Sequence, residues 1–352
     1  MKTALILVPA CCLASLACGT GNGQPDVAAD IPAVPETFTI MTFNVGTSSF
    51  MAGEDDPSGY TTELVAIQAA FFGNNLAWLP AAAGVRDLID QVRPDIVAFQ
   101  EMYYDVDCEA DCEEIAQDDP DLFEAACNSD QFPCKEWHEG GDIAVRRVLG
   151  PDYAVACAPG HPDNCVGVLK DFGTLAGCDD GPCIDGLDGM APPNGCTKGA
   201  RVATAVVHVH AGPTITVVDV HTTAGLNEDC RKAQFQQVFE DRGDGKPATY
   251  GDHNIVLGDM NIDPFDTYQA AHDDSVKYWN EQVGPDKDFG YISSSDASGP
   301  YTHPVTMTHL DHVVSDTLTG SCEVRAAAVG NPPTTETTFF DHRPVFCTVR
   351  MP

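Results

Sequence analysis

A set of polar residues stands at or just after the ends of apolar runs that are typical of buried strands. A buried strand holds its end rigidly while that end opens to solvent, so side chains there are well placed for chemistry. Each residue alone also suits a turn or a helix cap. The set consists of Asn44, Glu101, His221, Asp259, Asn261, Asp311, Asp341 and His342.

Together these residues offer the groups that hydrolysis of a phosphoester requires. Carboxylate and amide oxygens suit a hard cation such as Mg²⁺, which keeps several waters and binds phosphate oxygens. Two histidines with carboxylate neighbours, His221 and His342, can transfer protons. The reaction needs neutralised phosphoryl oxygens, an activated water and a stabilised leaving oxygen. The chain contains neither the G-x-S-x-G turn of serine hydrolases nor the G-x-x-x-x-G-K-[ST] loop of P-loop enzymes.

The first part of the chain predicts a strand, a helix and a second strand. Residues 37–45 are typical of a buried strand, and apolar residues at helical spacing predict a helix over 82–92. Pro94 ends that helix before a short strand at 95–99. Asn44 and Glu101 are thereby placed at the ends of two strands in one unit.

The second half of the chain is more regular. Two strands, 201–210 and 213–221, are joined by the turn Ala211-Gly212, and a polar helix is predicted around 227–240. A looped segment with Gly and Pro follows residue 257. Further strands are predicted at 153–157, 165–169, 254–257, 310–314, 323–328 and 344–349.

Composition limits the class of protein. The chain has 352 residues and a formal net charge of −35, and 43% of its residues are hydrophobic, which is enough for a sizeable core. This hydrophobic content excludes a disordered acidic tail. The negative charge repels nucleic acid and anionic membranes, so phosphate chemistry here requires bound cations. The length allows two domains or one large α/β sandwich.

The N-terminus predicts export from a bacterial cell. A short positive start and an apolar stretch over 4–17 form a signal peptide, residues 1–17. Cys18 follows it, and this context fits both ordinary cleavage and lipoprotein processing, which would anchor the chain to the outer membrane. Residues 18–36 are rich in Gly, Pro and Asp and predict a flexible tether. The protein is then periplasmic, membrane-anchored or extracellular.

Cysteine usage agrees with export. Of the 15 cysteines, Cys11, Cys12 and Cys18 lie in or at the end of the signal, and the remaining even number predicts six disulfides. Two cysteine-rich insertions are expected, at about 103–140 and 171–197. A zinc cluster in the first of them is the alternative, but its cysteines lack paired C-x-x-C spacing.

Near the C-terminus, Cys322 and Cys347 lie on candidate neighbouring strands. We predict that they pair with each other.

The ordered blocks TFNVG, DIVAFQE, VDVH, LGDMN, LDHVVSD and FDHRPV resemble the endonuclease/exonuclease/phosphatase superfamily, also called the deoxyribonuclease I-like fold. The resemblance covers residues 37–352. It implies an α/β (α+β) four-layer sandwich of two mixed β-sheets flanked by helices. It also implies one divalent-metal phosphoesterase site at the shared edge of the sheets.

The resemblance also implies roles for the oxygen-bearing residues. Glu101 is expected as the principal metal ligand, with Asn44 beside it and Asp341 near the metal. Asp259 and Asn261 are expected to position the attacking water and the phosphate. The cofactor expected is Mg²⁺, with Mn²⁺, Ca²⁺ and Co²⁺ as alternatives.

The same resemblance implies separate proton-transfer roles for the two histidines. His342 is expected to act as the general base, oriented by Asp311. His221 is expected to bind the phosphate or to protonate the leaving group. A histidine held by a carboxylate keeps a defined tautomer and a raised basicity, so these roles are chemically reasonable.

Secondary matches resemble secreted neutral sphingomyelinases of the C type, which release phosphocholine from a lipid. Tyr103 and Lys198 are expected to bind the substrate. The aromatic residues Tyr103, Tyr104 and Trp78 are expected either to hold a quaternary ammonium group or to pack in the core. The segment 326–338 departs from that family, because it is short, polar and free of aromatic residues.

Three alternatives remain beside the lipid phosphodiesterase. An extracellular deoxyribonuclease I-like nuclease would act on DNA, although basic residues are few. A phosphatase acting on a small inositol or sugar phosphate is the second. A non-catalytic binding protein is the third, and the intact site blocks speak against it. In each case we expect a monomer.

Overall fold

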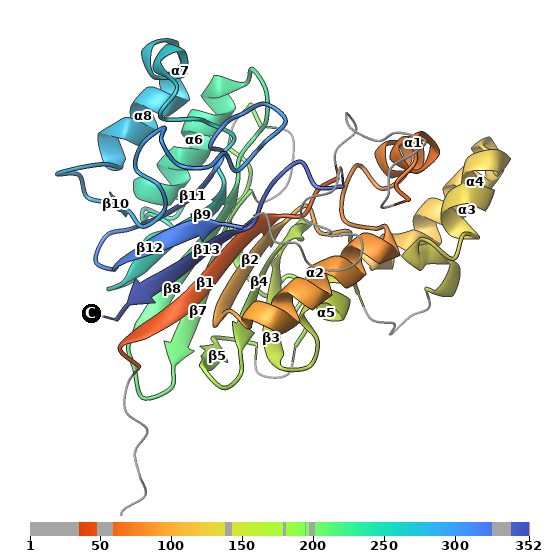
Figure 1. Ribbon diagram of the computed structural model, residues 1–352, viewed down its shortest axis with the longest axis horizontal. Helices are drawn as coiled ribbons and strands as arrows, with labels where there is room; N and C mark the ends of the chain where they lie inside the picture. Colours follow the sequence, from red (N-terminus) through yellow and green to blue (C-terminus); the bar gives the residue numbers. More distant parts are fainter. Residues whose placement is uncertain are drawn as a thin grey trace, which may run out of the picture. The chain divides into compact units, whose positions relative to one another are not determined.

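Two β-sheets pack face to face, with helices against their outer faces (Figure 1). The computed structural model describes residues 35–47, 59–137, 143–178, 181–193, 195–196, 201–325 and 339–351, without the side chains of Glu136, His161 and Pro162. The predicted signal peptide, nearly all of the tether, Lys198 and the segment 326–338 lie outside these residues. The predicted sandwich of two mixed sheets flanked by helices is confirmed.

The first sheet has the strand order β12-β13-β1-β2-β4-β3. Strands β1 and β2 are parallel and pair Asn44 with Gln100, while the other neighbours are antiparallel. Its strands are β1 (Thr37–Asn44), β2 (Ile96–Gln100), β3 (Tyr153–Ala158), β4 (His161–Leu169), β12 (Thr319–Val324) and β13 (Val345–Arg350).

The second sheet has the order β10-β11-β9-β8-β7-β5, with β6 paired to β7. Here β8 and β9 are parallel, and Asp259 pairs with His221 on one side and with Asp311 on the other. Its strands are β5 (Gly173–Leu175), β6 (Asp188–Gly189), β7 (Val202–Val209), β8 (Thr214–His221), β9 (Asn254–Asp259), β10 (Gly290–Tyr291) and β11 (Asp311–Ser315).

Helix α2 illustrates how the sequence encodes these elements. It spans Leu79–Val92 with Pro80 in its first turn, and it buries Val85, Leu88 and Ile89. Arg93 adopts a left-handed conformation (φ 41°) and Pro94 cannot continue the helix, so the chain enters β2. The predicted strand, helix and strand are therefore confirmed.

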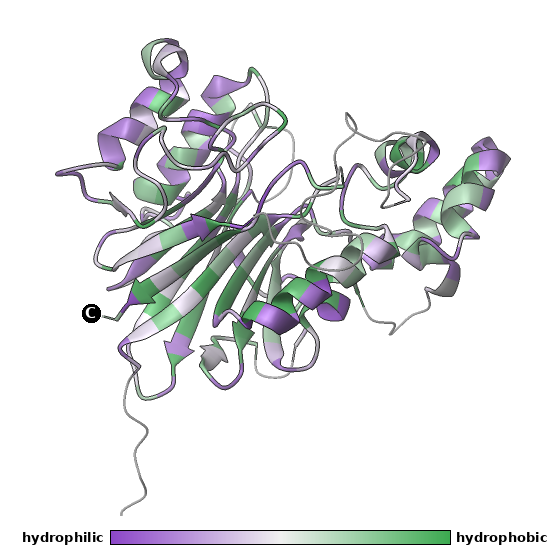
Figure 2. Cartoon of the chain, viewed as in Figure 1, coloured by the Kyte–Doolittle hydropathy of each residue, from purple (hydrophilic) through white to green (hydrophobic). Residues whose placement is uncertain are grey.

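The remaining helices cover the sheets or form the cysteine-rich excursion. Hydrophobic residues concentrate along the strands, and hydrophilic ones on the exposed turns of the helices (Figure 2). No helix in the described part of the chain is long and apolar enough to cross a membrane. These helices are α1 (Thr62–Ala70), α3 (Cys108–Asp118), α4 (Pro120–Cys127), α5 (Ala144–Leu149), α6 (Glu228–Phe239), α7 (Thr267–His272) and α8 (Asp274–Gln282).

Helices α7 and α8 were not predicted, because a looped segment was expected after residue 257. Asp266 and Asp273 cap them by accepting hydrogen bonds from the first free backbone N–H groups. Helix α8 then buries Val276 and Trp279 against α6. The caps and the apolar spacing are present in the sequence, but Gly and Pro nearby favoured a loop.

All six predicted disulfides form among the described cysteines. Cys322 lies directly opposite Cys347 in the β12–β13 ladder, which confirms their predicted pairing. The zinc alternative is wrong, because the cysteines of the first insertion pair with one another. The disulfides are Cys108–Cys134, Cys112–Cys127, Cys157–Cys165, Cys178–Cys183, Cys196–Cys230 and Cys322–Cys347.

Candidate active site

Residues from both sheets meet at one edge of the sandwich. Asn44, at the end of β1, donates hydrogen bonds from Nδ2 to Glu101 Oε1 and to Asp259 Oδ2, each at 3.0 Å. Glu101 follows β2 in the same sheet, whereas Asp259 ends β9 in the opposite sheet. One buried amide thus bridges two carboxylates across the sandwich.

The orientation of the Asn44 amide is fixed by its oxygen. The backbone N–H of Gly46 donates to Asn44 Oδ1 at 2.9 Å, so Nδ2 faces the carboxylates. Asn44 was expected in the metal shell. Its oxygen accepts from Gly46 and its nitrogen positions two carboxylates, while its place in a metal shell stays a prediction.

Glu101 has a positive backbone φ, and its carboxylate lies close to the backbone of Gly46. Its φ is 60°, and its side chain remains 26% exposed. A Cβ at position 46 would lie 1.9 Å from Glu101 Oε2, so only glycine leaves room for this carboxylate. Burial and the charge of Asp341 raise the pKa of Glu101 to about 7.

His342 and Asp311 form a buried dyad. His342 Nδ1 lies 2.7 Å from Asp311 Oδ2, and Nε2 lies 3.5 Å from Asp259 Oδ2. A carboxylate only accepts, so Nδ1 carries the hydrogen and Nε2 faces the cleft. Burial alone would lower the pKa of His342, but the charges of Asp311 and Asp259 outweigh it and hold the pKa well above the ordinary value.

Asp259 and Asn261 form a tight turn after β9. The Asn261 backbone N–H donates to Asp259 Oδ1 at 2.8 Å, and Asn261 Nδ2 donates to Oδ2 at 3.2 Å and to the Thr222 carbonyl at 3.0 Å. Asn261 adopts a φ of 49°, in the left-handed region that Asn tolerates. Burial raises the pKa of Asp259, and the charge of His342 opposes this.

His221 lies across Asp259 from His342. Its Nε2 is 3.4 Å from Glu101 Oε1 and 3.9 Å from Asp259 Oδ2, and its Nδ1 is 2.9 Å from an Arg201 guanidinium nitrogen. Arg201 was not among the predicted site residues. The expected hairpin, with its two-residue turn at 211–212, would place Arg201 opposite Thr222. The observed register pairs His208 with Thr214 and Val202 with Val220, which places Arg201 opposite His221.

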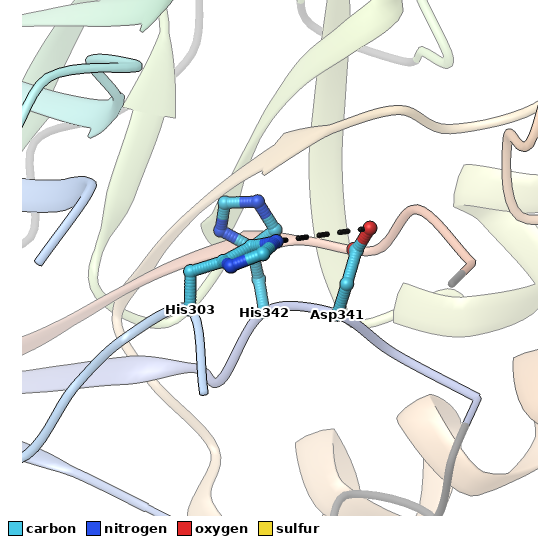
Figure 3. A group of neighbouring side chains, drawn as sticks. All are labelled: His303, Asp341 and His342. Atoms are coloured by element: carbon cyan, nitrogen blue, oxygen red, sulfur yellow. Dashed lines mark ion pairs between the residues drawn. The ribbon is translucent and has the colours of Figure 1, made fainter. Parts of the chain in front are cut away.

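His303 is a second residue that the sequence did not reveal. Its Nε2 lies 4.0 Å from Asp341 Oδ2, and its ring meets that of His342 edge-on at 4.7 Å (Figure 3). The backbone N–H of Thr306 donates to His303 Nδ1 at 3.2 Å. Burial and the charge of His342 lower the pKa of His303. A loop histidine of this kind follows no strand and carries no pattern.

Comparisons with known proteins agree with this architecture. No protein-family model matches the sequence, and a search of curated proteins finds no match. Among solved structures, D. rerio TDP2 in complex with a single strand DNA product aligns with a TM-score of 0.50 and 13% identity, covering 90% of this chain and 100% of that one. The chain has the deoxyribonuclease I-like fold.

Two further solved structures align at lower scores. An endonuclease/exonuclease/phosphatase from Beutenbergia cavernae DSM 12333 has a TM-score of 0.48 and 15% identity, covering 90% of this chain and 72% of that one. The human Nocturnin catalytic domain with bound sulfate has a TM-score of 0.47 and 12% identity, covering 90% of this chain and 94% of that one.

In this deoxyribonuclease I-like fold, the acidic cleft suits a divalent cation. Glu101 and Asp341 present partly exposed carboxylates that repel each other, and hard oxygen donors are the ligands that Mg²⁺ prefers. Gly46 leaves room for the Glu101 carboxylate. Two described groups also have ligand atoms close enough to share an ion, His303–Asp341–His342 and Asp259–Asp311–His342. The residues therefore fit the expected metal.

Tyr103, which was expected to bind the substrate, lies in the core. Tyr103 is buried, with its hydroxyl 3.6 Å from the sulfurs of Cys108 and Cys134, and its ring packs against Phe72. The excursion that contains α3 covers this residue, which explains the difference from the expectation. Lys198 lies outside the described residues.

Proposed function

We propose that the chain is an exported, divalent-cation-dependent phosphoester hydrolase that acts by in-line attack of water. The observation that carries the proposal is the Asp311–His342 dyad, whose Nε2 faces Asp259 beside the Asn44–Glu101 pair. A base, an orienting carboxylate and an acidic cation site within one cleft are what this reaction needs.

The side chains divide the work as follows. His342 Nε2 accepts the proton of the attacking water, and Asp311 holds the hydrogen on Nδ1. Asp259 and Asn261 orient that water and a phosphoryl oxygen. His221 Nε2 faces the same point from the opposite side and binds the phosphate.

Glu101 and Asp341 would hold the cation, while Asn44 keeps Glu101 in place. A bound divalent cation supplies charge neutralisation at the phosphoryl oxygens and stabilisation of the leaving oxygen. Mg²⁺ is the favoured ion, with Mn²⁺, Ca²⁺ or Co²⁺ as alternatives, because oxygen donors dominate the site.

Among phosphoesters we favour a diester with a zwitterionic headgroup, as in a sphingomyelinase or phospholipase C reaction. The chain carries a net charge of −35, and several of its few arginines are already paired with carboxylates. Arg147 pairs with Asp105, and Arg242 with Asp188 and Asp244. Few cations are left to track a polyanion.

A nuclease is the second candidate. D. rerio TDP2 shares the fold and was crystallised with a single strand DNA product. Such a substrate would need its backbone charge neutralised largely by bound cations, since basic side chains are few here. A small inositol or sugar phosphate remains a third substrate class.

Export is supported by the disulfides, which form in oxidising compartments. The signal peptide, the anchor through Cys18 and the monomeric state remain proposals from the sequence.

Purified mature protein tests the function when it is incubated with Mg²⁺, with and without a chelator. Sphingomyelin vesicles, phosphatidylcholine vesicles, plasmid DNA and an inositol phosphate serve as parallel substrates, and His342→Ala serves as the blank. We expect chelator-sensitive release of phosphocholine. DNA nicking alone would assign the nuclease, and no turnover of any substrate would contradict the proposal.

A further inference from the structure

Arg201 and His221 form a pair that combines backbone and side-chain contacts. They lie opposite each other where β7 begins and β8 ends, and the His221 backbone N–H donates to the Arg201 carbonyl at 2.9 Å. One guanidinium nitrogen of Arg201 then lies 2.9 Å from His221 Nδ1 and 3.4 Å from the His221 carbonyl. The arginine is therefore attached to a single residue by both its main chain and its side chain.

The chemistry of arginine decides which nitrogen of His221 carries the hydrogen. A guanidinium group has donors and no acceptor, so His221 Nδ1 must accept. The neutral ring then carries its hydrogen on Nε2. This Nε2 lies 3.4 Å from Glu101 Oε1 and 3.9 Å from Asp259 Oδ2.

His342 has the opposite arrangement. Its Nδ1 donates to Asp311, so in the neutral ring the lone pair lies on Nε2, which is 3.5 Å from Asp259 Oδ2. The two histidines therefore approach Asp259 with different groups, a donor from His221 and an acceptor from His342. Only the second can take a proton from water.

We propose that Arg201 is a positioning residue that fixes His221 as an Nε2–H donor, so that His221 binds a phosphoryl oxygen and does not act as a base. The part concerning the phosphoryl oxygen rests on the proposed function, whereas the tautomer does not. Both side-chain contacts come from the same terminal guanidinium nitrogen, which carries two hydrogens and so can donate to the ring and to the carbonyl together.

Nuclear magnetic resonance of metal-free protein with ¹⁵N-labelled histidine tests the tautomer, with His221→Gln used to assign the signals. We expect a pyridine-like Nδ1 and a pyrrole-like Nε2 for His221. The reverse pattern is expected for His342 once the pH exceeds the raised pKa of that ring. A pyrrole-like Nδ1 in His221 of the wild-type protein would overturn the proposal, whether or not the protein hydrolyses any substrate.

Variants of Arg201 test the functional consequence. Partners that orient active-site histidines are typically worth 10- to 100-fold in activity, so we expect Arg201→Met to lower kcat/KM about 10- to 100-fold and to mix the His221 tautomers. Arg201→Lys should restore the Nε2–H signal and part of the activity. Arg146→Met is the matched control, since Arg146 also donates to carbonyl groups but lies on α5. Full activity and an unchanged His221 signal in Arg201→Met would contradict the proposal.

If no substrate is hydrolysed by the wild-type protein, the proposed function fails while the tautomer measurement still decides the role of Arg201. If hydrolysis is observed and the wild-type tautomer is reversed, the positioning role fails alone.

Discussion

His342 and His221 flank the same carboxylate, yet one is held by an aspartate and the other by an arginine. His221 ends β8 and His342 lies three residues before β13, yet both are buried and both direct Nε2 at Asp259. The partner of Nδ1 makes the difference, because an acceptor there leaves Nε2 basic and a donor there makes Nε2 a donor. Residue type and position in a fold therefore do not determine the role of a histidine; its second hydrogen bond does.

The largest effect is expected from His342→Gln, because it removes the only group in this pair that can accept a proton. General-base catalysis is worth about 10²–10⁴-fold, so kcat should fall within that range. Steady-state kinetics on the best substrate measures it. His208→Gln, an exposed histidine on β7, is the control. Equal losses in both variants would show that the dyad is not catalytic.

Asp311→Asn should have the next largest effect. An asparagine can donate to Nδ1 and thereby give His342 the tautomer that His221 has, so we expect kcat to fall about 10²-fold or more. The ¹⁵N signals of His342 should reverse in the same variant. Exposed Asp152→Asn is the control, and unchanged His342 signals in Asp311→Asn would contradict the comparison.

His221→Gln should cost less than either change at the dyad. Glutamine retains a donor, so we expect a loss of about tenfold that appears mainly in KM, in keeping with the net value of a hydrogen bond to a charged group. A loss in kcat as large as that of His342→Gln would give His221 a role in proton transfer.

The strand-end residues could be predicted because buried strands leave a strong apolar pattern, and the ends of such strands meet at one edge. The predicted hairpin turn was one residue too short to pair Arg201 with His221, and His303 lies in a loop without a pattern. Tyr103 was misplaced because the excursion that buries it, with two disulfides, has no apolar period that would reveal its packing. The direction of the Asn44 amide depends on a backbone N–H two residues away and is invisible in sequence.

The smallest effect on activity is expected at Asp219, which lies two residues before His221 on β8. Asp219 accepts a hydrogen bond from Gln100 at 2.7 Å and is fully buried, and burial holds its pKa well above the ordinary value of 3.8. The native protein thus keeps a proton that the unfolded chain releases. Ionisation therefore favours the unfolded chain as the pH rises above about 4.

Asn cannot ionise, so Asp219→Asn removes the decrease in folding stability that ionisation of Asp219 causes above about pH 4. We expect a higher Tm than the wild type at pH 7 and little difference near pH 3, with catalysis nearly unchanged. Thermal unfolding at a series of pH values measures the effect. If Asp219→Asn instead lowers the Tm at pH 7 while leaving it unchanged at pH 3, Asp219 is ionised in the native protein.

The proposed mechanism requires a divalent cation in the cleft and His342 as the base. The decisive measurement is the initial rate of hydrolysis of a simple aryl phosphodiester over a range of Mg²⁺ concentrations, for wild type, His342→Gln and Glu101→Gln. We predict saturable activation of the wild type, a weakened Mg²⁺ response in Glu101→Gln, and a greatly reduced maximal rate in His342→Gln. Wild-type turnover that persists in excess chelator, or a full rate in His342→Gln, would contradict it.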